Sequence, residues 1–124
     1  MKVLIVDDDK TTRKMISLIL KSKGYEVVTA ENGIEALQIL GLEKINLILT
    51  DMNMPYMDGI ELIKQVRTNP DISNIPIVMI TTEADEDEKR KAFDAGVDDY
   101  LVKPTNAEQI NESIKKILKK FFNK

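Results

Sequence analysis

The sequence predicts an α/β protein in which five β-α units build one open parallel sheet. Short apolar runs alternate along the chain with segments whose apolar residues recur at helical spacing, and this alternation is typical of repeated β-α units. With 124 residues, 43% hydrophobic and 31% charged, the chain has the length and composition of one globular domain with a real core. We therefore expect a single domain over residues 1–124, without an attached output domain.

The first three units are defined by apolar runs, turn residues and one-sided helices. Strands are expected at three apolar runs bounded by turn residues, 2–6, 25–30 and 47–50. The first helix stops at Lys23-Gly24, the second begins after the Asn32-Gly33 turn, and a loop over 52–59 leads into the third. Apolar residues on one face indicate these helices: Met15, Ile16, Ile19, Leu20, Ala36, Leu37, Leu40, Leu62, Ile63 and Val66.

The last two units follow Pro76, with strands at 77–80 and 100–102. The fourth helix begins at the acidic run from Asp85 and stops at Ala95-Gly96. Two acid-containing pairs have the spacing of a capping box, in which the first side chain caps a helix. These pairs are Asp85 with Glu88, and Thr105 with Glu108. The fifth helix is indicated by one apolar stripe, Ile110, Ile114, Ile117, Leu118 and Phe121.

Composition excludes several kinds of site. The chain has no cysteine and no histidine, so disulfides, thiolate or histidine metal sites, Ser-His-Asp triads and a phosphohistidine intermediate are ruled out. A net charge of −3 argues against direct nucleic-acid binding, and no apolar stretch suggests membrane insertion or a signal peptide. We expect a cytoplasmic protein. An acidic stretch at 83–99 and a basic one at 103–124 are read first as solvated helix faces.

Four of the predicted strands end on polar residues suited to metal or phosphate chemistry. The first runs into Asp7-Asp8-Asp9, the third ends at Asp51, the fourth at Thr81 and the fifth at Lys103. In an open parallel sheet the carboxyl ends of all strands share one edge, where such folds bind ligands. Carboxylates, a hydroxyl and an ammonium at one edge suggest a divalent cation, which prefers oxygen ligands, together with a phosphoryl group.

Each of these residues also has an ordinary structural explanation. The three consecutive acids could be a loop and a helix N-cap, and Asp51 could be a turn residue before Pro55. Thr81 alone is a common strand residue, and Lys103 alone is more often a surface charge. Lys103 is, however, fixed between a strand and Pro104, a bond that is a candidate for the cis form. Their register across four strand ends favours a site over these separate explanations.

In these residues and their spacing, the sequence resembles the receiver domains of two-component response regulators. The resemblance runs from Val3 to about Leu118 and implies a flavodoxin-like, doubly wound fold with strand order 2-1-3-4-5. It rests on a set of motifs in the family's order and spacing: Val6-Asp7-Asp8, Thr50-Asp51-Met52-Asn53-Met54-Pro55, Met57-Asp58-Gly59, Ile80-Thr81-Thr82-Glu83-Ala84, Ala95-Gly96 and Lys103-Pro104.

The resemblance implies a Mg²⁺-dependent chemistry. Asp51 would accept a phosphoryl group from a phosphohistidine of a histidine kinase. Asp8 and Asp51 would ligate Mg²⁺ through their side chains and Asn53 through its backbone carbonyl, while Asp7 would act mainly through a metal-bound water. The chain would phosphorylate itself and then lose the phosphate slowly. It would not be an enzyme that turns over an external substrate.

The resemblance also implies a switch. Thr81 and Lys103 would hold the phosphoryl oxygens, and Tyr100 matches an aromatic that swings inward as Thr81 moves. Asn53 and Glu83 match positions that tune phosphate loss, here in the combination of chemotaxis regulators. The output face would be the fourth helix, fifth strand and fifth helix. Its partner would be a downstream protein, such as a flagellar motor or another effector, and a phosphatase is a further expected partner.

Two departures bear on that partner. Thr105 follows Lys103-Pro104 where the family usually has Phe, and the fourth helix opens with the acidic run 85–88. The output face therefore need not bind the partner that is usual for this family.

Two alternatives remain open on the sequence. The stretch Asp7-Asp8-Asp9-Lys10-Thr11 fits the D-x-D-x-T nucleophile motif of haloacid-dehalogenase-type phosphatases, with Asp7 and Asp9 as catalytic acids. Such enzymes need a further acidic pair after the lysine, where only Glu108 and Glu112 are available, and generally a longer chain. The second alternative keeps the receiver fold but makes it a phosphorelay intermediate, which passes its phosphate to a histidine phosphotransfer protein.

Overall fold

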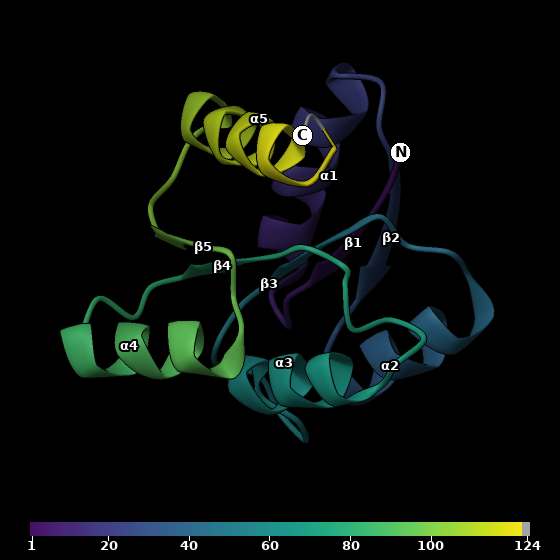
Figure 1. The fold of residues 1–124 in the computed structure, drawn as a ribbon. Coiled ribbons are helices and arrows are strands. Elements are labelled where there is room, and N and C mark those ends of the chain that lie inside the picture. The colour runs from purple at the N-terminus through teal and green to yellow at the C-terminus, as the bar shows by residue number, and fades with distance from the viewer. Residues whose placement is uncertain (123–124) are drawn as a thin grey trace.

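The computed structural model describes residues 1–122, which form a five-stranded sheet between two layers of helices (Figure 1). Asn123 and Lys124, included in the expected domain, lie outside the described residues. None of the helices within 1–122 is long and apolar enough to span a membrane. The elements in chain order are β1 (Lys2–Val6), α1 (Lys10–Ser22), β2 (Glu26–Ala30), α2 (Gly33–Leu42), β3 (Leu47–Thr50), α3 (Gly59–Thr68), β4 (Ile77–Thr81), α4 (Glu86–Ala95), β5 (Asp99–Val102) and α5 (Ala107–Phe122).

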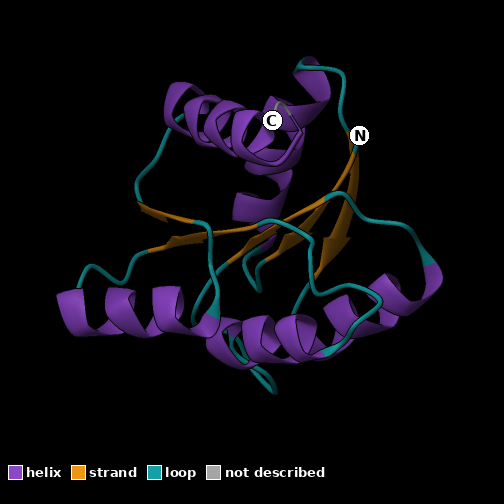
Figure 2. Ribbon diagram, in the orientation of Figure 1, coloured by secondary structure: helices purple, strands orange, loops and turns teal. Residues whose placement is uncertain are grey.

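The sheet has the strand order β2-β1-β3-β4-β5, and every neighbouring pair is parallel. This confirms the predicted β-α units and the strand order that the resemblance implied. Helices α1 and α5 cover one face, and α2, α3 and α4 cover the other (Figure 2). Because both faces are covered, β3 and β4 are buried along their whole length. Burial on both faces is why these strands read as continuous apolar runs.

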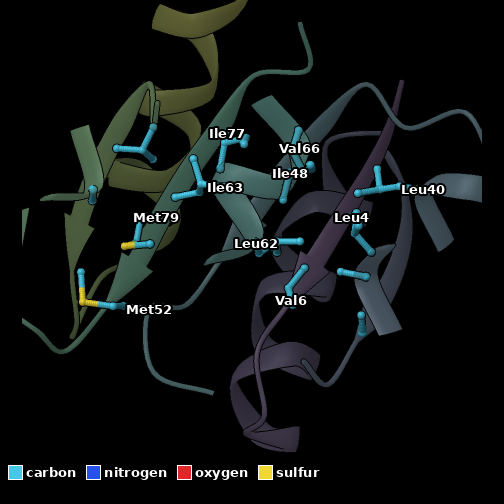
Figure 3. Close-up of a cluster of buried hydrophobic side chains, with 14 of the residues drawn as sticks. Leu4, Val6, Leu40, Ile48, Met52, Leu62, Ile63, Val66, Ile77 and Met79 are labelled. Carbon is cyan, nitrogen blue, oxygen red and sulfur yellow. The ribbon is translucent and has the colours of Figure 1, made fainter. Parts of the chain in front are cut away.

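Two hydrophobic clusters hold the layers together, because alternate strand residues point to opposite faces. Leu4 and Val6 of β1 face α2, α3 and α4, in the cluster drawn in Figure 3. Val3 and Ile5 face α1 and α5. The apolar helix faces expected from the sequence supply the rest of both clusters, so the sheet is fixed from both sides.

The second strand begins one residue later than the sequence suggested. The Tyr25 amide donates to the Leu20 carbonyl at 3.2 Å and so belongs to the end of α1. Gly24, just before it, has a φ of 87°, a conformation that glycine adopts without steric cost at helix ends. The ladder therefore starts at Glu26, whose register partner on β1 is Lys2.

One helix start was predicted correctly and another was wrong. Asp85 caps α4 by accepting the Glu88 amide at 3.2 Å, as expected. At α5 the cap is Asn106 and not Thr105, because the Asn106 side chain accepts the Gln109 amide at 2.9 Å. Thr105 instead donates its hydroxyl to the Gln109 side chain at 2.7 Å. The helix therefore begins one residue later than the Thr105 spacing indicated.

Arg67, near the end of α3, clamps three segments at the amino ends of β4 and β5. Its guanidinium donates to the carbonyls of Ser73 and Ile75 at 2.9 and 2.6 Å, and twice to that of Gly96 at 3.0 and 2.9 Å. It also pairs with the Asp98 carboxylate at 3.0 Å. Burial lowers the pKa of Arg67, and Asp98 opposes that effect. Most of the guanidinium's donors are therefore used inside the protein.

Gly96 is part of the same clamp. It ends α4 with a φ of 119°, and a Cβ there would lie 2.9 Å from the Arg67 side chain. Asp98 also accepts the Ile77 amide at 2.8 Å, so the clamp reaches the first residue of β4.

Replacing Arg67 with Ala should destabilise the fold by about 2–4 kcal/mol, because three partly buried carbonyls and the Asp98 carboxylate would lose their donors. Urea unfolding followed by circular dichroism measures this. Arg90→Ala is the matched control: Arg90 pairs with Asp87 on the surface at 3.3 Å, and its loss should cost less than about 1 kcal/mol. Equal midpoints for the two variants would contradict the clamp's role.

Candidate functional site

The predicted polar residues meet at the carboxyl edge of the sheet. Asp7 and Asp51 follow the neighbouring strands β1 and β3 directly, Thr81 is the last residue of β4, and Lys103 follows β5. The main-chain hydrogen bonds of the sheet continue one residue beyond β1 and β3, to Asp7 and Asp51. The Asp7 amide donates to Ala30 at 3.1 Å, and the Asp51 amide donates to Val6 at 2.9 Å. Both carboxylates are therefore held by main chain that is already part of the sheet.

An acidic cluster forms there from Asp7, Asp8 and Asp51. One carboxylate oxygen from each residue lies within 4.8 Å of the others. The Asp7 side chain is 3% exposed and that of Asp51 12%, while Asp8 is exposed. Carboxylates this close repel one another unless a cation or a proton lies among them.

The Lys103 ammonium supplies the nearest positive charge. Its Nζ lies 2.8 Å from an oxygen of Asp7 and 3.6 Å from one of Asp51. The Lys103 amide donates to the Thr81 carbonyl at 2.8 Å, and the Lys103-Pro104 bond is cis. Burial lowers the pKa of Lys103, but the hydrogen bond to Asp7 and the charge of Asp51 outweigh it, so the net pKa is raised.

The second oxygens of the buried carboxylates accept main-chain amides. Asp7 accepts the Asp9 amide at 2.8 Å, and Asp51 accepts the Met52 amide at 2.7 Å. Asp9 itself is the N-cap of α1: it accepts the Thr12 amide at 3.0 Å and the Thr12 hydroxyl at 2.6 Å. The Thr12 hydrogen bonds lower the pKa of Asp9. Of the three consecutive acids, Asp7 and Asp8 therefore belong to the site, and Asp9 caps the start of α1.

Thr81 and Tyr100 are linked through the main chain of Glu83. The buried Thr81 hydroxyl oxygen accepts the Glu83 amide at 3.3 Å, and the Tyr100 hydroxyl donates to the Glu83 carbonyl at 2.7 Å. Tyr100 is 7% exposed, with Phe93 6.4 Å away between ring centroids and Lys89 5.8 Å from its centroid. The Tyr100 ring is therefore buried against α4, and its predicted role in the switch stays a prediction.

Asn53 and Glu83 occupy the rim. Asn53 is exposed in the loop after Asp51. The Glu83 carboxylate accepts the Asp85 amide at 3.0 Å and so faces the start of α4. The predicted role of this pair in tuning phosphate loss stays a prediction.

The loop after Asp51 depends on glycines whose role motif reasoning did not identify. A Cβ at Gly59 would collide with the Asp51 carbonyl oxygen, and the Gly59 amide donates to Met52 at 2.8 Å. On its other side the loop packs against α2, where a Cβ at Gly33 would lie 2.6 Å from the Met57 side chain. The Met57-Asp58-Gly59 spacing was the available signal, but only the packing explains it.

The donor set decides which ion fits. Asp7, Asp8 and Asp51 offer only carboxylate oxygens, the ligand type that Mg²⁺ prefers, and an exposed Asp8 leaves room for the waters that Mg²⁺ retains. Softer metals favour nitrogen and sulfur ligands, and this chain has neither histidine nor cysteine. The cluster could therefore hold a hard divalent cation.

Alkaline titration tests the burial of Tyr100. Burial, followed by the negative charges of Glu83, Glu88 and Asp51, raises the pKa of its phenol to about 12. Because this folded pKa lies above the ordinary phenol pKa of 10.0, the neutral phenol stabilises the fold below pH 10, and that contribution is lost as the pH rises toward 12. The chain has no tryptophan, so ultraviolet absorbance follows phenolate formation. Subtracting the Tyr100→Phe titration should leave a transition near pH 12, and one near 10 would contradict this environment.

Known proteins resemble this chain over nearly its whole length. Residues 3–115 match the response regulator receiver domain family. The chain is 42% identical over 120 residues to the chemotaxis protein CheY1 of Helicobacter pylori, covering 95% of this chain and 97% of that protein. It is 39% identical over 121 residues to the chemotaxis protein CheY of Pseudomonas aeruginosa, covering 97% and 98%.

Solved structures agree in fold. The chemotaxis response regulator CheY4 of Vibrio cholerae superposes with a TM-score of 0.89 at 39% identity, covering 94% of this chain and 98% of that one. A two-component response regulator from Clostridium difficile gives 0.91 at 31% identity, covering 98% of both chains. The haloacid-dehalogenase alternative gains no support, since Asp51 is in the cluster and Asp9 is not. The chain belongs to the response regulator receiver domain family, and it is a CheY-like receiver of two-component signalling.

Proposed function

We propose that this receiver accepts a phosphoryl group on Asp51 from the phosphohistidine of a histidine kinase. The observation that carries the proposal is the convergence of the Asp51 carboxylate with Asp7, Asp8 and the Lys103 ammonium at one sheet edge. A carboxylate can be a nucleophile toward phosphorus. Its repulsion from an anionic phosphoryl group must be offset, and the Lys103 ammonium lies beside the carboxylates where that charge would lie.

Mg²⁺ is the ion proposed for the acidic cluster. Asp8 and Asp51 would hold it through carboxylate oxygens and Asn53 through its main-chain carbonyl, with Asp7 acting through a bound water. When bound, the ion neutralises the carboxylates and orients the phosphoryl oxygens.

The protein's own groups would divide the work of transfer. The Asp51 oxygen that faces Lys103 attacks phosphorus, while the other oxygen stays bound to the Met52 amide. Lys103 lies within reach of both Asp7 and Asp51, so it can shift from the carboxylates to a phosphoryl oxygen. Thr81, whose hydroxyl accepts the Glu83 amide, keeps its own proton to donate to a second phosphoryl oxygen.

The reaction acts on the chain itself. Phosphorylation and later hydrolysis at Asp51 consume no external substrate other than the donor and water, so we do not class the protein as an enzyme. Asn53 and Glu83 are proposed to tune the hydrolysis. The Glu83 carboxylate would first have to leave the Asp85 amide, to which it is bound at 3.0 Å.

The proposed output is a population shift at the α4-β5-α5 face. Thr81 and Tyr100 both contact Glu83, so a change at Thr81 reaches the Tyr100 ring and α4 through one residue's main chain. Phosphorylation would favour an arrangement that the protein already samples. The similarity to chemotaxis proteins favours a motility-type effector as partner. A downstream effector and a phosphatase complete the proposed partners, and the acidic first turn of α4 leaves the effector's own chemistry open.

Intact-mass spectrometry after incubation with acetyl phosphate tests the phosphorylation. The wild type should gain one phosphoryl group only when Mg²⁺ is present, and Asp51→Asn should gain none. Asp58→Asn is the matched control: Asp58 lies in the same loop but caps α3, a role that Asn also fills, so it should be phosphorylated like the wild type. Equal gain by Asp51→Asn, or no gain by the wild type, would refute the proposal.

The Asp9→Asn variant tests whether the protein is instead a haloacid-dehalogenase-type phosphatase. Asn should still cap α1, so the receiver should fold and accept a phosphoryl group as the wild type does. A haloacid-dehalogenase-type phosphatase would lose its second catalytic acid. Neither the wild type nor this variant should turn over p-nitrophenyl phosphate in a colorimetric assay. Steady turnover that disappears in Asp9→Asn would instead establish the phosphatase.

A further inference from the structure

Tyr56 adopts an unusual backbone conformation in the loop beyond Asp51. Its φ of 67° is the only positive value of a non-glycine residue within residues 1–122. The Met57 amide donates to the Pro55 carbonyl at 2.8 Å, which makes Tyr56 the central residue of a three-residue turn. Such turns with a positive central φ are rare and strained, and a bulky residue in this region is a conformational outlier.

The surrounding loop holds this conformation in place. The Gly59 amide returns to the Met52 carbonyl at 2.8 Å, so the segment between them closes on itself next to Asp51. The Met57 carbonyl accepts the Gly33 amide at 3.2 Å, and the Met57 side chain lies against Gly33. Tyr56 thus lies at the tip of a loop that is fixed at its base and at its side.

The Tyr56 side chain is barely covered by the rest of the protein. It is 86% exposed, more than any other large hydrophobic residue among those described, and only Leu42 at 85% is comparable. Leu42 ends α2 in ordinary helical backbone, whereas Tyr56 combines exposure with strain. Strained residues that the fold does not itself need are found at binding and catalytic sites.

The loop's position indicates what would use the ring. Tyr56 is three residues from Gly59, so their Cα atoms are at most about 11 Å apart, and Gly59 packs against the Asp51 carbonyl. A specific interface covers about 800 Å² on each partner, equivalent to a circle of radius about 16 Å. An interface of this size centred on Asp51 would therefore extend as far as Tyr56.

We propose that Tyr56 is a docking residue for the phosphohistidine-bearing partner, an inference that rests on the proposed function. Tyrosine offers a large, rigid contact area at low entropic cost and is enriched at binding hot spots. In the transfer, the bond between phosphorus and the imidazole nitrogen breaks as a bond from an Asp51 oxygen to phosphorus forms. The imidazole nitrogen keeps the electron pair and takes a proton from water. Tyr56 takes no part in these bonds and acts by holding the donor protein.

Two donors separate docking from chemistry. The protein donor is the chemotaxis histidine kinase of the same organism, autophosphorylated with ATP and purified. The small donor is phosphoramidate, which carries the same phosphorus–nitrogen bond without a protein surface. Second-order rate constants for both are measured by intact mass and quenched-flow gels on the wild type, Tyr56→Ala and Tyr56→Phe. Leu42→Ala is the control for losing an equally exposed apolar side chain.

Tyr56→Ala should lower the rate constant for the kinase by about thirtyfold relative to that for phosphoramidate, the loss that corresponds to the lower limit for a hot-spot side chain. The loss should appear in the kinase concentration for half-maximal rate, and not in the rate at saturation. Tyr56→Phe and Leu42→Ala should keep the wild-type ratio. Tyr56→Gly, which relieves the backbone strain, should melt no lower than the wild type while losing the same kinase preference.

Several results would overturn this inference without touching the proposed function. An unchanged ratio in Tyr56→Ala would remove Tyr56 from the interface. An equal loss with both donors would assign Tyr56 to loop geometry, and a loss in Leu42→Ala would assign the effect to general surface apolarity. In contrast, a wild type that neither donor phosphorylates would refute the proposed function itself.

Discussion

The charge balance between Lys103 and the carboxylates of Asp7 and Asp51 is the interaction on which the site depends. Asp7 is 2% exposed, and a buried carboxylate without a partner is unfavourable by several kcal/mol (~3–5 when its pair is broken). Lys103 provides that partner from 96 positions away in the sequence, joining the first strand to the last. The same ammonium can neutralise only part of three acids, so the cluster keeps a net negative charge. Lys103 therefore offsets part of the repulsion among the acids, and the rest favours the binding of a cation.

The parallel sheet makes this arrangement possible. Four of the five strands deliver functional residues at their carboxyl ends. The hydrogen bonds of the sheet set the spacing of the strands, and hydrophobic clusters cover the sheet on both faces. Close packing continues into the loops, where Gly59 lies against the main chain of Asp51. The chemistry is thus carried by short segments on a rigid support, which is how open α/β folds build their sites.

Much of the site could be predicted because strand ends in a parallel sheet share one edge. The cap of α5 could not, since Thr105 and Asn106 are both good capping residues and only the tertiary path of the chain selects Asn106. The burial of Tyr100 depends on Phe93 of α4 and the Glu83 carbonyl, which periodicity within β5 does not reveal. Arg67 gave no sequence signal either, because most of its acceptors are main-chain carbonyls.

The Arg67 clamp has a consequence for how motion would travel through this domain. It ties the end of α3, the approach to β4 and the turn after α4 at the amino edge of the sheet. Helix α4 runs from that fixed end at Gly96 to Glu86, beside the Glu83 contacts at the opposite edge. A displacement at Glu83 would therefore pivot the helix about Gly96, as a lever with one hinged end. The first turn of α4 would move farthest. The amino edge of the sheet, where Arg67 binds Gly96, would stay still.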